Sequence, residues 1–167
     1  MIRLAVEKDL NKIDELAVSV IETMTEHNIP QWDLSYPRKS HYEKDIENGT
    51  LYILEDGTIQ GVMAIAEEND PPYKELTNWT DDSSIVIHRI LVDPTLRRKG
   101  IAKKLFEFAV NLSLEKGFTS IKIDTHANNY IMQNLLKKLG FKEVGFLKSI
   151  NRDAFELILS QFGGQDE

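Results

Sequence analysis

Stretches of helical periodicity alternate with short apolar runs along the chain. From residue 8 onward, apolar residues recur every three or four positions, which is the pattern of one buried helix face. The same spacing follows Gly100, begins again at Met132, and stops at Gly117 and Gly140, which are typical helix ends. The pattern predicts helices over residues 8–24, 40–47, 101–116 and 132–139, and strands over residues 2–6, 51–55, 59–67, 85–92, 120–125, 144–150 and 154–159.

The order of these elements predicts a mixed α/β (α+β) fold built on one sheet. Asp56-Gly57 predicts a tight hairpin because both residues tolerate positive φ. The nearly continuous β-branched run at 85–92 is typical of a strand buried on both faces at the centre of a sheet. Residues 69–84 are polar without periodicity and predict a long loop, and residues 163–167 a frayed tail. The length of 167 residues, without repeat or linker, predicts one domain over 1–167.

The composition is that of a folded globular protein, with 41% hydrophobic and 28% charged residues. Cysteine is absent, which excludes disulfides, thiolate zinc sites and a cysteine nucleophile. No metal site is predicted. The first residues lack the apolar core of a signal peptide, and no apolar run reaches the roughly 18 residues of a membrane span. We therefore expect a cytoplasmic protein that does not bind a membrane.

The charge is unevenly distributed. Twenty Lys and Arg against 27 Asp and Glu give a net charge of −7, which disfavours nucleic acid as a partner. Between Pro94 and Phe106, however, there are five basic residues and no acid, so the rest of the chain carries −12. The five are Arg97, Arg98, Lys99, Lys103 and Lys104.

This basic segment lies where the predicted central strand meets the long helix, and it is built like a phosphate site. The first N–H groups of a helix have no intrahelical acceptor, and Gly100 lets the backbone approach a ligand closely. Cations at a helix N-terminus oppose the helix dipole, so a bound polyanion explains them better than a solvated face. The segment has neither a Walker P-loop nor a Gly-x-Gly-x-x-Gly motif, which leaves nucleoside triphosphates and dinucleotides without support.

Arg97-x-x-Gly100-x-Ala102, following Leu91-Val92-Asp93-Pro94, resembles the acetyl-CoA motif of the GNAT (Gcn5-related) N-acetyltransferase superfamily. A second block, residues 124–133 with Leu139-Gly140-Phe141, is similar to the fifth strand and fourth helix of that family. The resemblance spans essentially the whole chain. It implies a mixed, largely antiparallel sheet, flanked by helices, whose fourth and fifth strands splay apart.

The resemblance also implies acetyl-CoA (coenzyme A) as cofactor and assigns residues to it. The pantetheine arm is expected to pair with the backbone of the strand before the motif, and the pyrophosphate to lie on the amides of the motif. Asn129 is expected to contact the cofactor from the second block. The cofactor-binding set is Ile90, Leu91, Val92, Arg97, Arg98, Lys99, Gly100, Ile101, Ala102 and Asn129.

The reaction implied is direct attack of a primary amine, in a small molecule or peptide, on the thioester. The backbone N–H of Leu91 is the expected oxyanion donor. The candidates for the base are Glu67, Glu68, His88 and His126. The structural alternatives are a core histidine for His88, solvated carboxylates for Glu67 and Glu68, and a role in orienting the loop after the strand for His126. The family commonly has a tyrosine seven residues after the asparagine, but this chain has Leu136, so a non-catalytic CoA-binding or acyl-CoA-binding module is the alternative function.

Large aromatic residues mark the two irregular segments. Trp32, Tyr36 and Tyr73 are candidates for the wall of the acceptor pocket, because binding residues concentrate in such segments. Packing over the open side of the sheet explains the rings equally well. A homodimer is compatible with the sequence. The sequence does not identify the acceptor.

Overall fold

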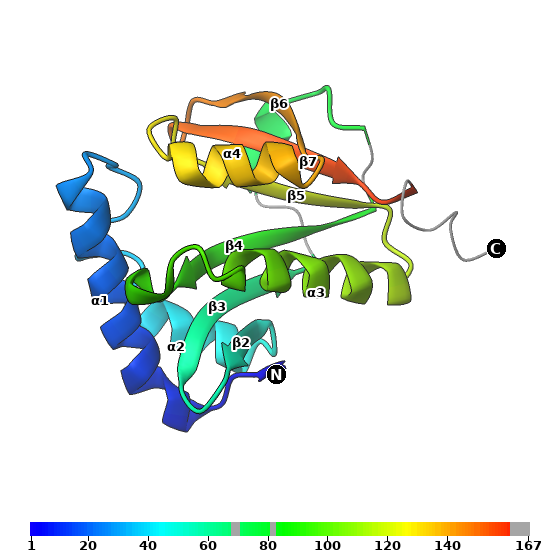
Figure 1. Ribbon diagram of the computed structural model, residues 1–167. Helices are drawn as coiled ribbons and strands as arrows, with labels where there is room; N and C mark the ends of the chain where they lie inside the picture. Colours follow the sequence, from blue (N-terminus) through cyan, green and yellow to red (C-terminus); the bar gives the residue numbers. More distant parts are fainter. Residues whose placement is uncertain (68–70, 81–82, 161–167) are drawn as a thin grey trace. The chain divides into compact units, whose positions relative to one another are not determined.

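The structure is a computed structural model that describes residues 1–67, 71–80 and 83–160. Glu68 and the predicted tail at 163–167 lie outside these residues. Helices and strands occur in the predicted order (Figure 1). They are β1 (Ile2–Leu4), α1 (Leu10–Glu26), α2 (Lys39–Glu47), β2 (Leu51–Glu55), β3 (Ile59–Ala66), β4 (Ser84–Val92), α3 (Ile101–Glu115), β5 (Ser120–Thr125), α4 (Tyr130–Lys138), β6 (Lys142–Leu147) and β7 (Arg152–Ile158), with short 3₁₀ helices η1 (Glu7–Asp9), η2 (Pro71–Glu75) and η3 (Pro94–Leu96).

The strands form one sheet in the order β1-β2-β3-β4-β5-β7-β6. The β1–β2, β2–β3, β5–β7 and β6–β7 pairs are antiparallel, whereas β4 and β5 are parallel. Their parallel register covers Ser84–Val86 and Ser120–Lys122. This arrangement confirms the predicted mixed, largely antiparallel sheet.

The central strand β4 changes character along its length. Residues 84–87 are buried, as predicted for a strand covered on both faces. His88, Arg89 and Ile90 are half-buried, and Leu91 is buried again. The second half of β4 is therefore partly open, although the nearly continuous β-branched run predicted a strand buried on both faces.

The described chain divides into two compact units. The first contains Met1–Ile65 and His88–Phe108, and the second contains the described residues of 66–87 and 109–160. This division does not test whether the chain is one domain, so the single domain over 1–167 stays a prediction.

The first unit has an apolar core built from α1, α2, β2 and β3. Gly61 of β3 lies close to α3, since a Cβ added there would stand 3.0 Å from side-chain atoms of both Ile101 and Leu105. Glycine thus lets the helix pack directly on the strand. The buried residues of this core are Ala5, Leu10, Ile13, Leu16, Ala17, Ile21, Trp32, Tyr42, Leu51, Ile53, Ile59, Val62, Ala64 and Leu91.

The second unit has its own apolar cluster around Tyr73. The Tyr73 ring stacks on Trp79 at 5.2 Å between centroids, and the indole N–H of Trp79 donates to the Tyr73 carbonyl at 2.8 Å. The Nζ atom of Lys122 lies 4.8 Å from the centre of the Trp79 ring. The prediction of an unstructured loop over residues 69–84 is therefore wrong for Pro71–Glu75, which form η2 and carry a buried aromatic side chain.

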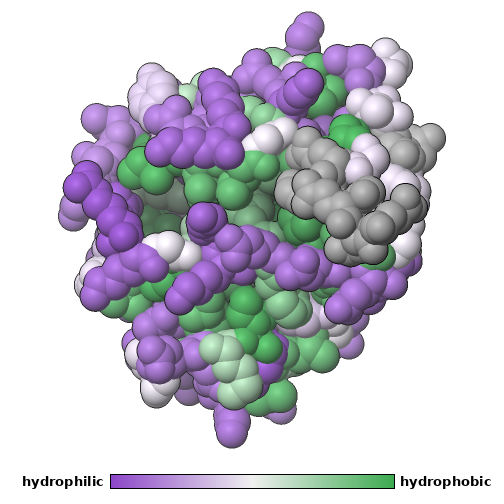
Figure 2. Space-filling view, turned by 45° about the vertical axis from the view of Figure 1, so that its right-hand side comes forward, coloured by the Kyte–Doolittle hydropathy of each residue, from purple (hydrophilic) through white to green (hydrophobic). Residues whose placement is uncertain are grey.

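No helix in the described ranges is long and apolar enough to cross a membrane. The face shown in Figure 2 interleaves hydrophilic and hydrophobic residues. Isolated exposed apolar residues are normal on folded proteins and need no special function.

Candidate active site

The turn that joins β4 to α3 is shaped by side-chain and backbone hydrogen bonds. Oδ1 of Asp93 accepts from the backbone N–H of Thr95 at 2.9 Å and from the Thr95 hydroxyl at 2.8 Å. The Asp93 carbonyl accepts from the Leu96 N–H at 2.9 Å. Asp93 thus caps η3 and defines the direction in which the chain leaves the sheet.

Two residues after η3 have left-handed backbone conformations. Arg98 has φ of 66° and Gly100 has φ of 75°. A Cβ added at Gly100 would meet no heavy atom within 4 Å, so glycine is favoured there by its φ and leaves open space in front of the backbone. The Gly100 carbonyl accepts from the Lys104 N–H at 3.0 Å, which makes it the first acceptor of α3. Successive N–H groups in such a turn can form an anion-binding concavity.

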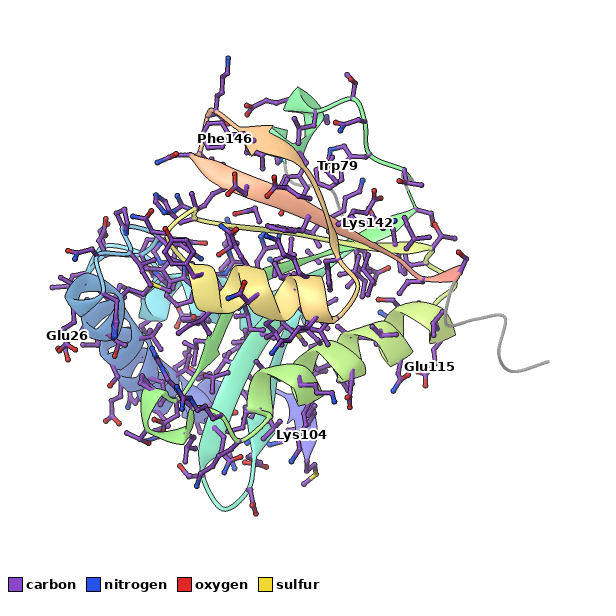
Figure 3. The ribbon with its side chains drawn as sticks, turned by 45° about the horizontal axis from the view of Figure 1, so that its top comes forward. Glu26, Trp79, Lys104, Glu115, Lys142 and Phe146 are labelled. Atoms are coloured by element: carbon purple, nitrogen blue, oxygen red, sulfur yellow. The ribbon has the colours of Figure 1, made fainter. Side chains whose placement is uncertain are left out.

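The charges of this turn are exposed and oppose the dipole of α3. Arg97, Arg98 and Lys99 are exposed and take part in no ion pair with the residues that the structure describes. Lys104 lies toward the N-terminal end of α3 and Glu115 at its C-terminal end (Figure 3). Both positions run against the helix macrodipole, which favours anions at the N-terminus and cations at the C-terminus. An anion bound at the turn would compensate for the first of these costs.

The backbone assigned to pantetheine lies directly before this turn. Leu91 is 3% exposed, and its carbonyl lies near Gly61 of β3. Ile90 and Val92 are half-buried. The neighbouring Asp93 N–H donates to the Gln60 carbonyl at 2.9 Å, which holds the end of β4 against β3.

His88 begins the part of β4 that belongs to the first unit. Burial, and to a smaller extent the charge of Arg89, together lower the pKa of His88 to about 4. The imidazole is therefore neutral at pH 7, with a lone pair that can accept a proton.

His126 and Asn129 lie in the second unit, on the loop from β5 to α4. The Nδ1 atom of His126 accepts from the Asn128 N–H at 3.0 Å, and burial followed by the charge of Arg152 lowers the pKa of His126. Oδ1 of Asn129 accepts from the Met132 N–H at 3.2 Å and caps α4. Gln133 donates to the His126 carbonyl at 3.1 Å, so this loop is held from several sides.

The remaining predicted residues occupy different environments. Glu67 is exposed, and its Oε2 lies 3.0 Å from Nζ of Lys116. Trp32 belongs to the first core, and Tyr73 donates from its hydroxyl to Asp124 at 2.7 Å inside the second unit. Both rings therefore have packing roles. Tyr36 is 37% exposed.

Leu136 is completely buried, so the position where the family commonly has tyrosine belongs to a hydrophobic interior here. Among the described residues, no group of three or more His, Asp or Glu side chains is arranged to hold a metal ion.

Sequence reasoning missed Arg89, which has φ of 50° in the middle of β4. Its guanidinium is bound by Asp45 of α2 and by Tyr36. No local pattern could reveal this conformation, since arginine is not among the residues enriched at positive φ.

Sequence comparison gives one family and two related proteins. Residues 17–141 match the family described as Acetyltransferase (GNAT) family. Streptothricin acetyltransferase from Escherichia coli is 38% identical over 65 residues, which cover 39% of this chain and 36% of that protein. GCN5-related N-acetyltransferase 6, chloroplastic, from Arabidopsis thaliana is 34% identical over 73 residues, or 42% of this chain and 25% of that protein. The aligned part of the chain thus spans about a third or less of each relative's length.

Solved structures match nearly the whole chain. An acetyltransferase of the GNAT family from Streptococcus agalactiae superposes with a TM-score of 0.85 at 25% identity, covering 95% of this chain and 94% of that one. One from Listeria monocytogenes gives a TM-score of 0.77 at 23% identity, with coverage of 95% and 94%. At 23% identity, the match to the Listeria monocytogenes structure shows only that the fold is shared.

Proposed function

Because the chain belongs to the acetyltransferase (GNAT) family, we propose that it transfers the acetyl group of acetyl-CoA to a primary amine of a small molecule or peptide. The observation that carries the proposal is the turn 97–102, where exposed cations and two left-handed residues precede the first helical hydrogen bond of α3. The backbone N–H groups of this turn suit the pyrophosphate of acetyl-CoA, and the cations of the turn assist in binding it. Charge-assisted hydrogen bonds contribute about 1.5–3 kcal/mol each, more than exposed cations do.

Acetyl-CoA supplies an activated acetyl group as a thioester. The amine nitrogen attacks the carbonyl carbon, a C–N bond forms, and the charge that develops on the oxygen is stabilised by the Leu91 N–H. The C–S bond then breaks, and the thiolate takes up a proton from solvent, to which the base returns the proton that it has accepted from the nitrogen. Thiols have a pKa near 8.5, so the thiolate leaves without help from a side chain at position 136.

For the proton lost by the attacking nitrogen, we favour His88 over the other candidates. The nitrogen becomes more acidic once it has added to the carbonyl, and the neutral imidazole of His88 has a lone pair that can accept its proton. Glu67 is paired with Lys116 in solvent, and Nδ1 of His126 already accepts a hydrogen bond. Asn129 caps α4, and its proposed contact with the cofactor uses the rest of its amide.

The proposal is tested by calorimetry with acetyl-CoA and by thiol release with an amine panel. Streptothricin, named in one relative, and a peptide with a free amine are the first acceptors to test. The chain has no cysteine, so a thiol reagent sees only released CoA. Binding without acceptor-dependent release would support the non-catalytic alternative, and absence of binding would refute both functions.

Gly100→Trp tests the turn itself, with Gly57→Trp as its matched control. Both glycines have nearly the same φ, 75° and 76°, and a Cβ at either meets nothing within 4 Å. Backbone strain is therefore equal, but only position 100 borders the proposed pyrophosphate. Loss of two charge-assisted hydrogen bonds should weaken acetyl-CoA binding at least about 100-fold in Gly100→Trp. Equal affinity of the two variants would contradict the assignment of the turn.

A further inference from the structure

Arg89 has a left-handed backbone inside a strand, with φ of 50°. It lies in the half-buried part of β4, two residues before Leu91. A non-glycine residue pays for such a conformation, and the conformation persists only where the surrounding structure holds it. Contacts with the surrounding residues must therefore hold Arg89 in this conformation.

Three side chains of the segment 36–45 bind Arg89, and we refer to Tyr36, Tyr42 and Asp45 as the Arg89 clamp. The Asp45 carboxylate accepts two hydrogen bonds from the guanidinium, both at 2.6 Å. The Tyr36 hydroxyl accepts a third at 2.9 Å. The Tyr42 hydroxyl donates to the backbone carbonyl of Arg89 at 3.3 Å.

Two members of the clamp, Tyr42 and Asp45, lie in the interior of the first unit. Tyr42 is completely buried, and Asp45 is 5% exposed. The two lie three residues apart on α2 and so share one helix face. Burial raises the pKa of Tyr42 well above its usual value, so the hydroxyl keeps its proton and remains a donor. The clamp therefore grips both the side chain and the backbone of Arg89.

Stability alone is a weak reason for such a pair, because removing two charges from water offsets much of their attraction. The position of Arg89 in β4, just before Ile90 and Leu91, is a better reason for the pair. Since φ and ψ of Arg89 direct the following peptide groups, holding this residue orients the N–H groups of Ile90 and Leu91. An oxyanion donor must lie within about 2.7–3.1 Å of the developing charge to be effective.

We propose that Arg89 is a positioning residue, held by Asp45, Tyr36 and Tyr42 so that the strand backbone that follows it presents an N–H group to the reacting carbonyl. This inference rests on the proposed function. It requires no contact between Arg89 and either substrate. Pantetheine is assigned to the same stretch of backbone, so loosening the clamp should lower turnover and should also weaken acetyl-CoA binding, while the turn 97–102 still holds the pyrophosphate.

The test compares Asp45→Asn with Asp14→Asn as a matched control. Asp14 also accepts two hydrogen bonds from an arginine, at 3.0 and 3.1 Å from Arg38, and it accepts a third from the Lys39 N–H rather than from β4. Both variants weaken a carboxylate–guanidinium pair of the first unit. Asp45→Asn should lower kcat by about 10- to 100-fold, because misplacement of catalytic groups by about 1 Å has effects of this size. The Kd for acetyl-CoA should rise by a smaller factor than kcat falls, and Asp14→Asn should keep the kcat of the parent protein.

A second readout is independent of turnover. The amide ¹H and ¹⁵N chemical shifts of Ile90 and Leu91, measured on the full chain with CoA, should move in Asp45→Asn and stay in place in Asp14→Asn. Unmoved shifts, or equal kcat in the two variants, would overturn the positioning role. If the parent protein binds acetyl-CoA but turns over no acceptor, the proposed function fails, and the shifts alone decide whether the clamp orients these amides. If Asp45→Asn does not fold, Tyr42→Phe removes the carbonyl contact and is judged by the same two readouts.

Discussion

Protonation of His88 should couple the stability of the protein to pH. The perturbation is a replacement, His88→Gln, that keeps a polar side chain of similar length and removes the titratable ring. In the folded protein, burial first and then Arg89 lower the pKa of His88 to about 4, whereas the ordinary value is 6.5. The unfolded chain therefore binds more protons than the folded chain between about pH 4 and 6.5, and stability falls as the pH falls through this window.

The size of the effect follows from the difference between the two pKa values. A difference of one pKa unit corresponds to about 1.4 kcal/mol, so the parent protein should lose about 3 kcal/mol between pH 7 and pH 4 through this residue. His88→Gln should not lose this part. Other groups also titrate, including the carboxylates of Asp9 and Asp14, whose pKa values are lowered in the folded protein. They are present in both proteins and cancel in the difference.

Urea unfolding followed by circular dichroism, at half-unit steps from pH 4 to pH 7.5, measures the required difference. The free energy of unfolding of the parent protein minus that of His88→Gln should rise with pH over this range and level off near pH 7. A difference that stays constant with pH would show that His88 titrates normally in the folded protein. The argument that burial lowers the pKa of His88 would then be refuted.

Two core positions give further predictions. Gly61→Ala places a Cβ 3.0 Å from side-chain atoms of Ile101 and Leu105 and 3.3 Å from the Leu91 carbonyl oxygen. It should therefore lower the free energy of unfolding, measured by urea titration, by about 1–3 kcal/mol. An unchanged midpoint would mean that α3 moves away from β3 without a cost in stability. Leu136→Tyr puts a phenol where the side chain has no exposed surface, so it should destabilise by a similar amount, about 1–3 kcal/mol, and leave the rate of CoA release no higher than before. A faster release would show that an acid can act from this position.

The order of the elements could be predicted because each has a clear local pattern. The helix ends expected at Gly117 and Gly140 are confirmed, since α3 and α4 stop two residues earlier and both glycines have positive φ. The hairpin at Asp56-Gly57 joins β2 to β3 as expected. These features depend on neighbouring residues, and a single sequence contains that information.

Features that depend on distant residues escaped prediction. The burial of Trp32 and Tyr73 is decided by tertiary packing, so an aromatic residue in an irregular segment looks the same whether it lines a pocket or fills a core. The guanidinium of Arg89, whose backbone is left-handed, is bound by Asp45, 44 residues away in the chain. The basic turn was recognisable because its charges and its glycine are contiguous, whereas the clamp is assembled from separated positions.

The two tryptophans of the chain fall one in each compact unit, and this has a practical consequence. Trp32 lies in the first core, and Trp79 stacks on Tyr73 in the second unit. Replacing either indole by phenylalanine leaves a fluorophore that reports on one unit alone. Emission spectra of the two single-tryptophan proteins, followed through denaturation, therefore resolve whether the sheet melts in one cooperative step or unit by unit. Each compact unit thus contains its own intrinsic fluorescence probe.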